Sequence, residues 1–167
     1  MPNWCGNYIK FYGDAKQIAK LEKMLEDLVA SNDDSMQGHR PNWEAVKKAN
    51  CHYMFDIQLD GDGQIQFDTA WSPAISLVFL LGRRYDLGYV HRWDESGNSL
   101  YGKAVFRTAN KNFLDLYDGS SLNFRYDFDS GMYIYNGQEY ESQYDFIDEV
   151  VDNLMPSLTH KNEILRP

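Results

Sequence analysis

The sequence contains few cysteines and no long hydrophobic run, and both absences exclude classes of protein. Cys5 and Cys51 are the only two cysteines among 167 residues, too few for a disulfide-rich scaffold or for the usual four ligands of an iron–sulfur cluster. No apolar run approaches the roughly 20 residues that cross a bilayer, and the N-terminus lacks the basic-then-apolar order of a signal peptide. We therefore expect a cytoplasmic protein whose two cysteines are buried as apolar side chains.

The chain also lacks recognisable catalytic motifs. Its four histidines are scattered, and none forms a metal-binding spacing with a neighbour: His39, His52, His91 and His160. The nucleophile elbow, the phosphate-binding glycine loop and the dinucleotide fingerprint are absent from the sequence. We therefore predict that the protein is not an enzyme and that it carries no metal ion or other cofactor.

Positive charge is scarce in the last third of the chain. The net charge of the whole chain is −9, yet the first 111 residues carry 13 basic side chains against 14 acidic ones. Residues 112–167 carry three basic side chains against eleven acidic ones, so nearly the whole imbalance lies there. Such a surface repels a phosphate backbone, which argues against direct binding of nucleic acid by this segment.

The first part of the chain alternates between strand and helix patterns. Residues 5–12 alternate apolar and polar side chains, as a half-buried strand does. Asp14 is a suitable N-cap for a helix, and apolar residues recur after it at helical spacing: Ile18, Leu21, Leu25 and Leu28. Residues 42–50 have a weaker pattern that predicts a second, short helix.

A hairpin, a helix and further strands follow. Residues 55–60 and 64–68 alternate on either side of a glycine-rich turn, which predicts a β-hairpin. Ser72 and Pro73 supply an N-cap and a first-turn proline for a helix that ends near Tyr85. Strands are expected at residues 89–94 and 100–108. The order of these elements predicts an α+β fold of ferredoxin-like βαββαβ type, with two helices on one face of an antiparallel sheet.

The sequence after residue 111 is predicted to be an acidic β/α extension packed on the same domain. Strand patterns occupy residues 122–128 and 132–135. A closing helix is indicated by apolar spacing before Pro156: Tyr144, Ile147, Val151 and Leu154. The predicted organisation is therefore a ferredoxin-like domain over residues 1–111 and a tyrosine-rich extension over residues 112–167.

Two short aromatic signatures carry a resemblance to a known family. They read MPNWCGN at residues 1–7 and FDTAWSP at residues 67–73. With the helix and strand that follow the second signature, they resemble the phage and plasmid proteins described as YubB or Api92-like, which have a ferredoxin-like domain. The resemblance covers roughly residues 1–108. It implies the fold that the periodicity predicts, and it implies a mobile genetic element as the biological setting.

The signatures have both a structural and a functional interpretation. In the structural one, their tryptophans pack within or beside the core and their asparagines bond the ends of strands. In the functional one, three tryptophans line a groove for an aromatic or nucleobase ligand: Trp4, Trp71 and Trp93. Ferredoxin-like sheets can bind RNA bases through exposed aromatic rings on their central strands. The second function that we predict is therefore a small-ligand, nucleotide or RNA-binding module on the open face of the sheet.

Two carboxylates are also expected on that open face. A hairpin register that pairs Ile57 with Phe67 places Asp56 opposite Asp68, where like charges repel each other. The two groups then face water, bind a divalent metal ion, or pair with a cation, for which there are three candidates: Lys10, Arg92 and Lys103. A metal-assisted hydrolase built on this pair is a third, weaker functional hypothesis.

The acidic extension is the basis of the leading hypothesis. Tyrosine gives rigid contact area that tolerates water, and carboxylates attract basic partners, although the acidic groups can equally serve solubility alone. The predicted partner-binding residues combine both types: Asp115, Asp118, Tyr126, Asp127, Asp129, Tyr133, Tyr135, Glu139 and Glu141. We predict a non-enzymatic phage or plasmid accessory protein that inhibits a host defence or nucleic-acid-processing protein with a basic surface, in the manner of anti-CRISPR or anti-restriction proteins.

Overall fold

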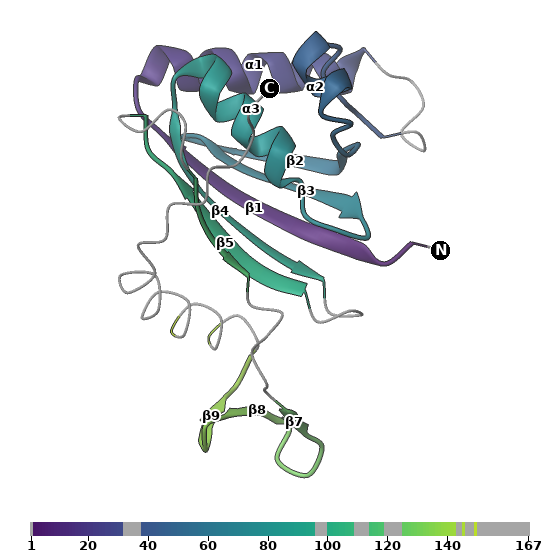
Figure 1. Ribbon diagram of the computed structural model, residues 1–167, viewed down its shortest axis with the longest axis vertical. Coiled ribbons are helices and arrows are strands. Elements are labelled where there is room, and N and C mark those ends of the chain that lie inside the picture. The colour runs from purple at the N-terminus through teal and green to yellow at the C-terminus, as the bar shows by residue number, and fades with distance from the viewer. Residues whose placement is uncertain are drawn as a thin grey trace.

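A computed structural model describes residues 2–31, 38–95, 100–108, 114–118 and 125–142, together with Asp145 and Glu149. Figure 1 shows a large curved sheet and a second, small sheet that lies apart from it; the helices of the described residues lie on one side of the large sheet. The side of the large sheet opposite these helices is called the open face below.

The large sheet has six antiparallel strands. They are ordered β2 (Phe55–Gly61), β3 (Gln64–Ala70), β1 (Trp4–Tyr12), β4 (Gly88–Glu95), β5 (Leu100–Phe106) and β6 (Leu114–Asp118). The chain from β1 to β4 has the βαββαβ order in which two crossover helices interleave the strands. The predicted α+β, ferredoxin-like class is confirmed, and β5 and β6 extend the sheet beyond β4.

Among the described residues, three helices cover one face of this sheet: α1 (Ala15–Ala30), α2 (Glu44–Lys48) and α3 (Ile75–Tyr85). The Asp14 carboxylate accepts hydrogen bonds from the backbone N–H groups of Lys16 and Gln17 at 3.0 and 3.1 Å, so the predicted N-cap of α1 is confirmed. The short helix predicted at residues 42–50 is present as α2. Among the described residues, no helix combines the length and apolar character needed to cross a membrane.

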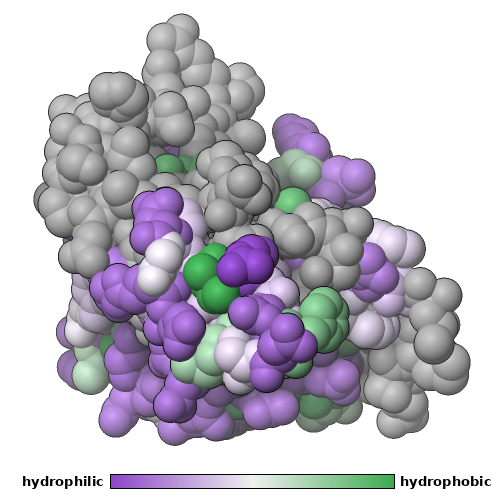
Figure 2. All heavy atoms as spheres, turned by 90° about the horizontal axis from the view of Figure 1, so that it is seen from below, coloured by the Kyte–Doolittle hydropathy of each residue, from purple (hydrophilic) through white to green (hydrophobic). Residues whose placement is uncertain are grey.

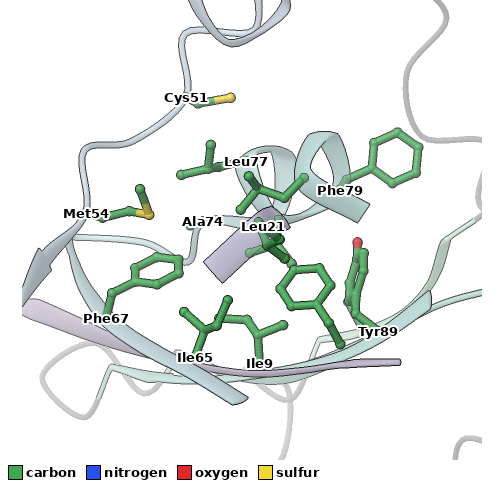
Figure 3. Packing of buried hydrophobic residues seen from close by; sticks show 14 of the residues in the cluster. Ile9, Leu21, Cys51, Met54, Ile65, Phe67, Ala74, Leu77, Phe79 and Tyr89 are labelled. Carbon is green, nitrogen blue, oxygen red and sulfur yellow. The ribbon is translucent and has the colours of Figure 1, made fainter. Parts of the chain in front are cut away.

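The hydrophobic core lies between the sheet and the helices, and Figure 3 shows its packing. Ile9 and Ile65 project from the sheet toward the helix layer, where Leu21 and Leu77 are fully buried. Cys5 and Cys51 are 0% and 3% exposed and are not joined in a disulfide. Both cysteines therefore serve as buried side chains, as the composition predicted.

The start of α3 differs from the prediction. The helix begins at Ile75, its N-cap is Ala74, and no side chain caps it. The Ser72 hydroxyl lies 3.1 Å from His52 Nε2 instead, and the Ser72 carbonyl accepts a hydrogen bond from Thr69. Ser72 is therefore committed to contacts before the helix and does not serve as its N-cap.

The register of the β2–β3 hairpin also differs from the prediction. Phe55 pairs with Asp68 and Gln58 with Gln66, and the register shifts between these two pairs. Asp56 lies in this bulge with a positive φ of 48°. The bulge removes Asp56 from the position opposite Asp68, and the sequence alternation alone could not reveal it.

The second sheet has three antiparallel strands: β7 (Arg125–Asp127), β8 (Met132–Tyr135) and β9 (Gln138–Tyr140). The strand predicted at residues 132–135 is confirmed, and the one predicted at 122–128 is present as the shorter β7. Most of the predicted closing helix lies outside the described residues. The segment after residue 111 also supplies β6 to the large sheet, since β6 pairs with β5.

Candidate binding surfaces

The two aromatic signatures meet around the side chain of Asn7. Its amide Nδ2 donates to the Cys5 carbonyl and to Thr69 Oγ1, both at 2.9 Å. Its Oδ1 accepts from the Ala74 N–H at 2.9 Å and lies 3.0 Å from His91 Nε2. Asn7 is only 1% exposed, so one buried amide joins β1, β3, β4 and the start of α3.

His91 completes this buried network and is not protonated to a cation near neutral pH. Burial lowers its pKa to about 3, so the ring is neutral. Because Asn7 Oδ1 is an acceptor, the proton of the ring lies on Nε2, and Nδ1 has no hydrogen-bond partner among the described residues.

Further hydrogen bonds join the two signatures and hold the second one together. The Trp71 N–H donates to the Asn3 carbonyl at 2.8 Å, and Thr69 Oγ1 donates to the Ser72 carbonyl at 2.7 Å. Trp71 has a positive φ of 69°, which is unusual for a bulky residue. These contacts favour the structural interpretation of the signatures, since most of their polar groups hold the junction of β1, β3 and α3.

The three tryptophans predicted to line a groove do not lie together. Trp93 is 4% exposed and is on the helix-covered face, where its ring lies 5.2 Å from that of His91. Trp4 is 46% exposed and packs edge-to-face on Phe55 at 4.9 Å, and Trp71 is 55% exposed. The prediction of one groove containing all three rings is wrong, because strand alternation puts Trp93 in the core and Trp4 on the open face.

Asp56 and Asp68 remain near each other despite the bulge. Burial raises the pKa of the Asp68 carboxyl, and the negative charge of Asp56 raises it further. The Lys10 ammonium, one of the predicted counter-cations, donates instead to the Asp62 carbonyl at 2.7 Å. Among the residues that the structure describes, no group of three or more His, Cys, Asp or Glu side chains could hold a metal ion.

The open face carries a hollow that the sequence analysis did not predict. It has a volume of about 300 Å³ and is lined by eight residues of β1, β3 and β4. Ile9 and Ile65 belong to the core, and the other six have their side chains on the open face: Tyr8, Lys10, Gln64, Gln66, Val90 and Arg92. Figure 2 views the molecule from the side opposite the helices, with the small sheet toward the viewer, and the described residues visible in it are mostly hydrophilic with a few hydrophobic ones between. Strand alternation could place these residues on one face, but the order of the strands was needed to make them neighbours.

The small sheet carries exposed aromatic side chains at its β7–β8 turn. Phe128 is 89% exposed and its ring stands perpendicular to that of Tyr126 at 5.0 Å. Tyr126 pairs across the strands with Tyr133, and these two rings also lie 5.0 Å apart. We call Tyr126, Phe128 and Tyr133 the aromatic tip. Phe128 was missed because the prediction selected tyrosines and carboxylates, although its position between two aspartates before Ser-Gly indicates an exposed turn.

The turn that presents Phe128 is held by its own hydrogen bonds. The Asp127 carboxylate accepts from the Asp129 N–H at 3.0 Å, and the Asp127 carbonyl accepts from the Gly131 N–H at 2.8 Å. Gly131 has a positive φ of 72°, which glycine adopts without strain. These bonds define the conformation in which the aromatic ring projects into water.

The predicted partner-binding residues are distributed over two sheets. Asp115 and Asp118 are in β6, opposite Val105 and Gly102 of the large sheet. On the small sheet, strand alternation puts Tyr126, Tyr133 and Tyr135 on one face and Asp127 and Glu139 on the other. Asp129 and Glu141 are exposed beyond the strand ends. The structure therefore places the three tyrosines on one face of the small sheet and the four carboxylates on its other face or beyond its strand ends.

Comparison with known proteins identifies the family. A family model described as the ferredoxin-like domain in Api92-like protein matches residues 50–146, more than half of the chain. The match begins after the first signature and continues past residue 108 through β7, β8 and β9, so the small sheet lies within the matched region. No curated protein and no solved structure matched the chain. The chain therefore belongs to the family of Api92-like proteins with a ferredoxin-like domain.

Proposed function

We propose that the protein is a non-enzymatic accessory protein that binds a bacterial host protein through its small sheet. The observation that carries this proposal is the aromatic tip, in which the Phe128 side chain is 89% exposed. A large apolar ring in water gains free energy when a partner covers it, and aromatic side chains are common among the residues that contribute most to protein interfaces.

Two features of the small sheet favour a specific partner. The turn at Phe128 is fixed by internal hydrogen bonds, so little conformational entropy is lost on binding. Between residues 125 and 142 the chain has one basic residue, Arg125, and four acidic ones: Asp127, Asp129, Glu139 and Glu141. The small sheet therefore combines exposed aromatic rings with net negative charge, which complements a partner that has an apolar pocket and a basic surface, as in a protein that normally binds nucleic acid.

Inhibition of such a partner is the function that follows from this chemistry. Carboxylates of the small sheet would occupy the places that phosphates take in the groove of a defence or nucleic-acid-processing protein, which corresponds to anti-CRISPR or anti-restriction action. The encounter would take place in the cytoplasm of the bacterial host.

A comparative pull-down tests the proposal. The tagged full chain and its Phe128→Ala variant are incubated with nuclease-treated host lysate, and the captured proteins are identified by mass spectrometry. We expect one salt-sensitive partner with the original chain and at least about 30-fold weaker binding by the variant, as for a central interface residue. Tyr53→Ala is the control, because Tyr53 is also an exposed aromatic residue, at 45%, and lies outside the small sheet.

Charge reversal and an activity assay complete the test. Asp129, Glu139 and Glu141 are each replaced by Lys, whereas Asp127 is retained because its carboxylate holds the turn. The reversed variant should bind more weakly and lose most of the salt dependence. Unchanged affinity in both variants would refute binding through the small sheet, and a captured partner that keeps its full activity would refute inhibition.

A further inference from the structure

The hollow on the open face combines cationic, aromatic and amide side chains on neighbouring strands. Tyr8 and Lys10 come from β1, Gln64 and Gln66 from β3, and Arg92 from β4. The register places Tyr8 between Gln66 and Arg92, with Lys10 in the next row, between Gln64 and Val90. A volume of about 300 Å³ is at the lower end of the range for small-molecule sites.

The cationic side of the hollow has a positioned ammonium group. Lys10 Nζ donates to the backbone carbonyl of Asp62 at 2.7 Å, which orients the group without neutralising its charge. Arg92 adds a guanidinium one strand away and one row along. An ammonium and a guanidinium that border the same hollow are suited to one phosphate group.

The aromatic side of the hollow depends on Gly6. A Cβ atom at Gly6 would lie 2.9 Å from Tyr8 Oη and 3.1 Å from Tyr8 Cε2, so the Tyr8 ring lies over the backbone where a side chain is missing. This ring is 37% exposed. A ring that rests on a sheet and is open to solvent is a surface on which a planar base can stack.

The amides of Gln64 and Gln66 supply the third element. An amide both donates and accepts hydrogen bonds, as the edge of a nucleobase does. Gln66 Nε2 donates to Asp60 at 2.9 Å, which fixes the position of its side chain. The hollow thus offers groups for a phosphate, for the face of a base and for the edge of a base.

We propose that the hollow binds a free nucleoside monophosphate, with its phosphate at Lys10 and Arg92 and its base on Tyr8. A single nucleotide fits a volume of about 300 Å³. Its one phosphate interacts mainly with the nearby charges of Lys10 and Arg92. A long nucleic acid would also be repelled by the net charge of −9 that the whole chain carries. This site uses none of the residues of the small sheet, so it is independent of the proposed partner binding.

Calorimetric titration of the full chain with AMP, GMP, CMP and UMP tests the site. Inorganic phosphate, the four nucleosides and a ten-nucleotide oligothymidylate serve as comparison probes. We expect saturable one-to-one binding of at least one monophosphate, weakened at least about tenfold in Arg92→Gln and in Lys10→Gln. Lys47→Gln is the matched control, because it removes the same charge from α2 on the helix-covered side and should leave affinity unchanged.

A further variant tests the place of the base. Gly6→Ala adds a methyl group that displaces the Tyr8 ring, and it should weaken a monophosphate more than it weakens inorganic phosphate. Circular dichroism confirms that each variant is folded. Equal affinity for phosphate and monophosphates would overturn nucleotide recognition. Tighter binding of the oligothymidylate than of any monophosphate would overturn the free nucleotide as ligand, and no binding at millimolar concentration would overturn the site.

Discussion

At the scale of single residues, the pair Asn7 and His91 explains why the signatures contain so many polar groups. Asn7 forms hydrogen bonds with three backbone groups and two side chains inside the core. A buried polar group that loses its partners destabilises a protein by about 1 to 3 kcal/mol. The fold itself therefore explains why Asn and His occupy these two positions, without a role for either residue in binding a ligand.

The neutral state of His91 predicts a pH dependence of stability. Its pKa is about 3 in the folded chain against an ordinary 6.5, so the unfolded chain binds a proton that the folded chain does not. The free energy of unfolding should therefore fall as the pH drops below about 6.5, by up to about 1.4 kcal/mol per pH unit. Urea denaturation at about pH 7, 6 and 5 measures this slope.

The variant His91→Gln isolates this effect. Its amide can still donate to Asn7 but does not titrate, so the slope should become shallower. Some slope should persist, because burial also lowers the pKa of His52. If the variant kept the full slope of the original chain, the titration would have to come from another group.

At the scale of elements, the β2–β3 turn shows how one glycine is fixed by its surroundings. Gly61 and Gly63 both have positive φ, 80° and 76°. A Cβ at Gly63 would lie 2.8 Å from the Phe11 carbonyl, whereas a Cβ at Gly61 would have no atom within 4 Å. The Gly63 N–H also donates to Glu22 of α1 at 2.8 Å. The turn is thereby attached both to β1 and to α1.

This difference predicts unequal effects of the same substitution. Gly61→Ala should lower the free energy of unfolding by about 1 kcal/mol, from backbone strain alone. Gly63→Ala adds a steric clash with a backbone oxygen and should cost about 3 kcal/mol. Chemical denaturation of both variants provides the comparison, and equal losses would show that the contact with Phe11 relaxes without cost.

At the scale of the whole molecule, β6 decides where the large sheet ends. β6 pairs with β5, and Leu116 packs partly buried against the core. A chain that ends at residue 108 would leave the β5 edge uncovered, and an exposed strand edge invites pairing with another copy. The predicted boundary at residue 111 would separate these two neighbouring strands.

Two shortened chains test this organisation. A chain of residues 1–118 should be monomeric, whereas a chain of residues 1–108 should be less stable by about 2 kcal/mol and should associate. Size-exclusion chromatography and urea denaturation measure both properties. Equal behaviour of the two chains would support residues 1–111 as a self-sufficient domain.

The sequence predicted much of the large sheet because local rules govern its elements. Alternation identified β1, the Asp14 cap identified the start of α1, and the βαββαβ order led to the correct fold class. The prediction of an N-cap failed at Ser72, because the hydroxyl of this residue lies within hydrogen-bond distance of His52, which is 20 residues away in the sequence. Alternation failed at Asp56, because a bulge shifts the register without changing the pattern of residue types.

By itself, the sequence determined the secondary structure pattern, the charge of the last third and the family. Only the tertiary structure decided which residues share a surface. The order of the strands brought Tyr8, Lys10 and Arg92 to one hollow. Packing of the helices on the other face of the sheet buried Trp93 in the core. The physical reason is that periodicity fixes the side of an element on which a residue lies, whereas neighbours across a sheet depend on contacts between distant parts of the chain.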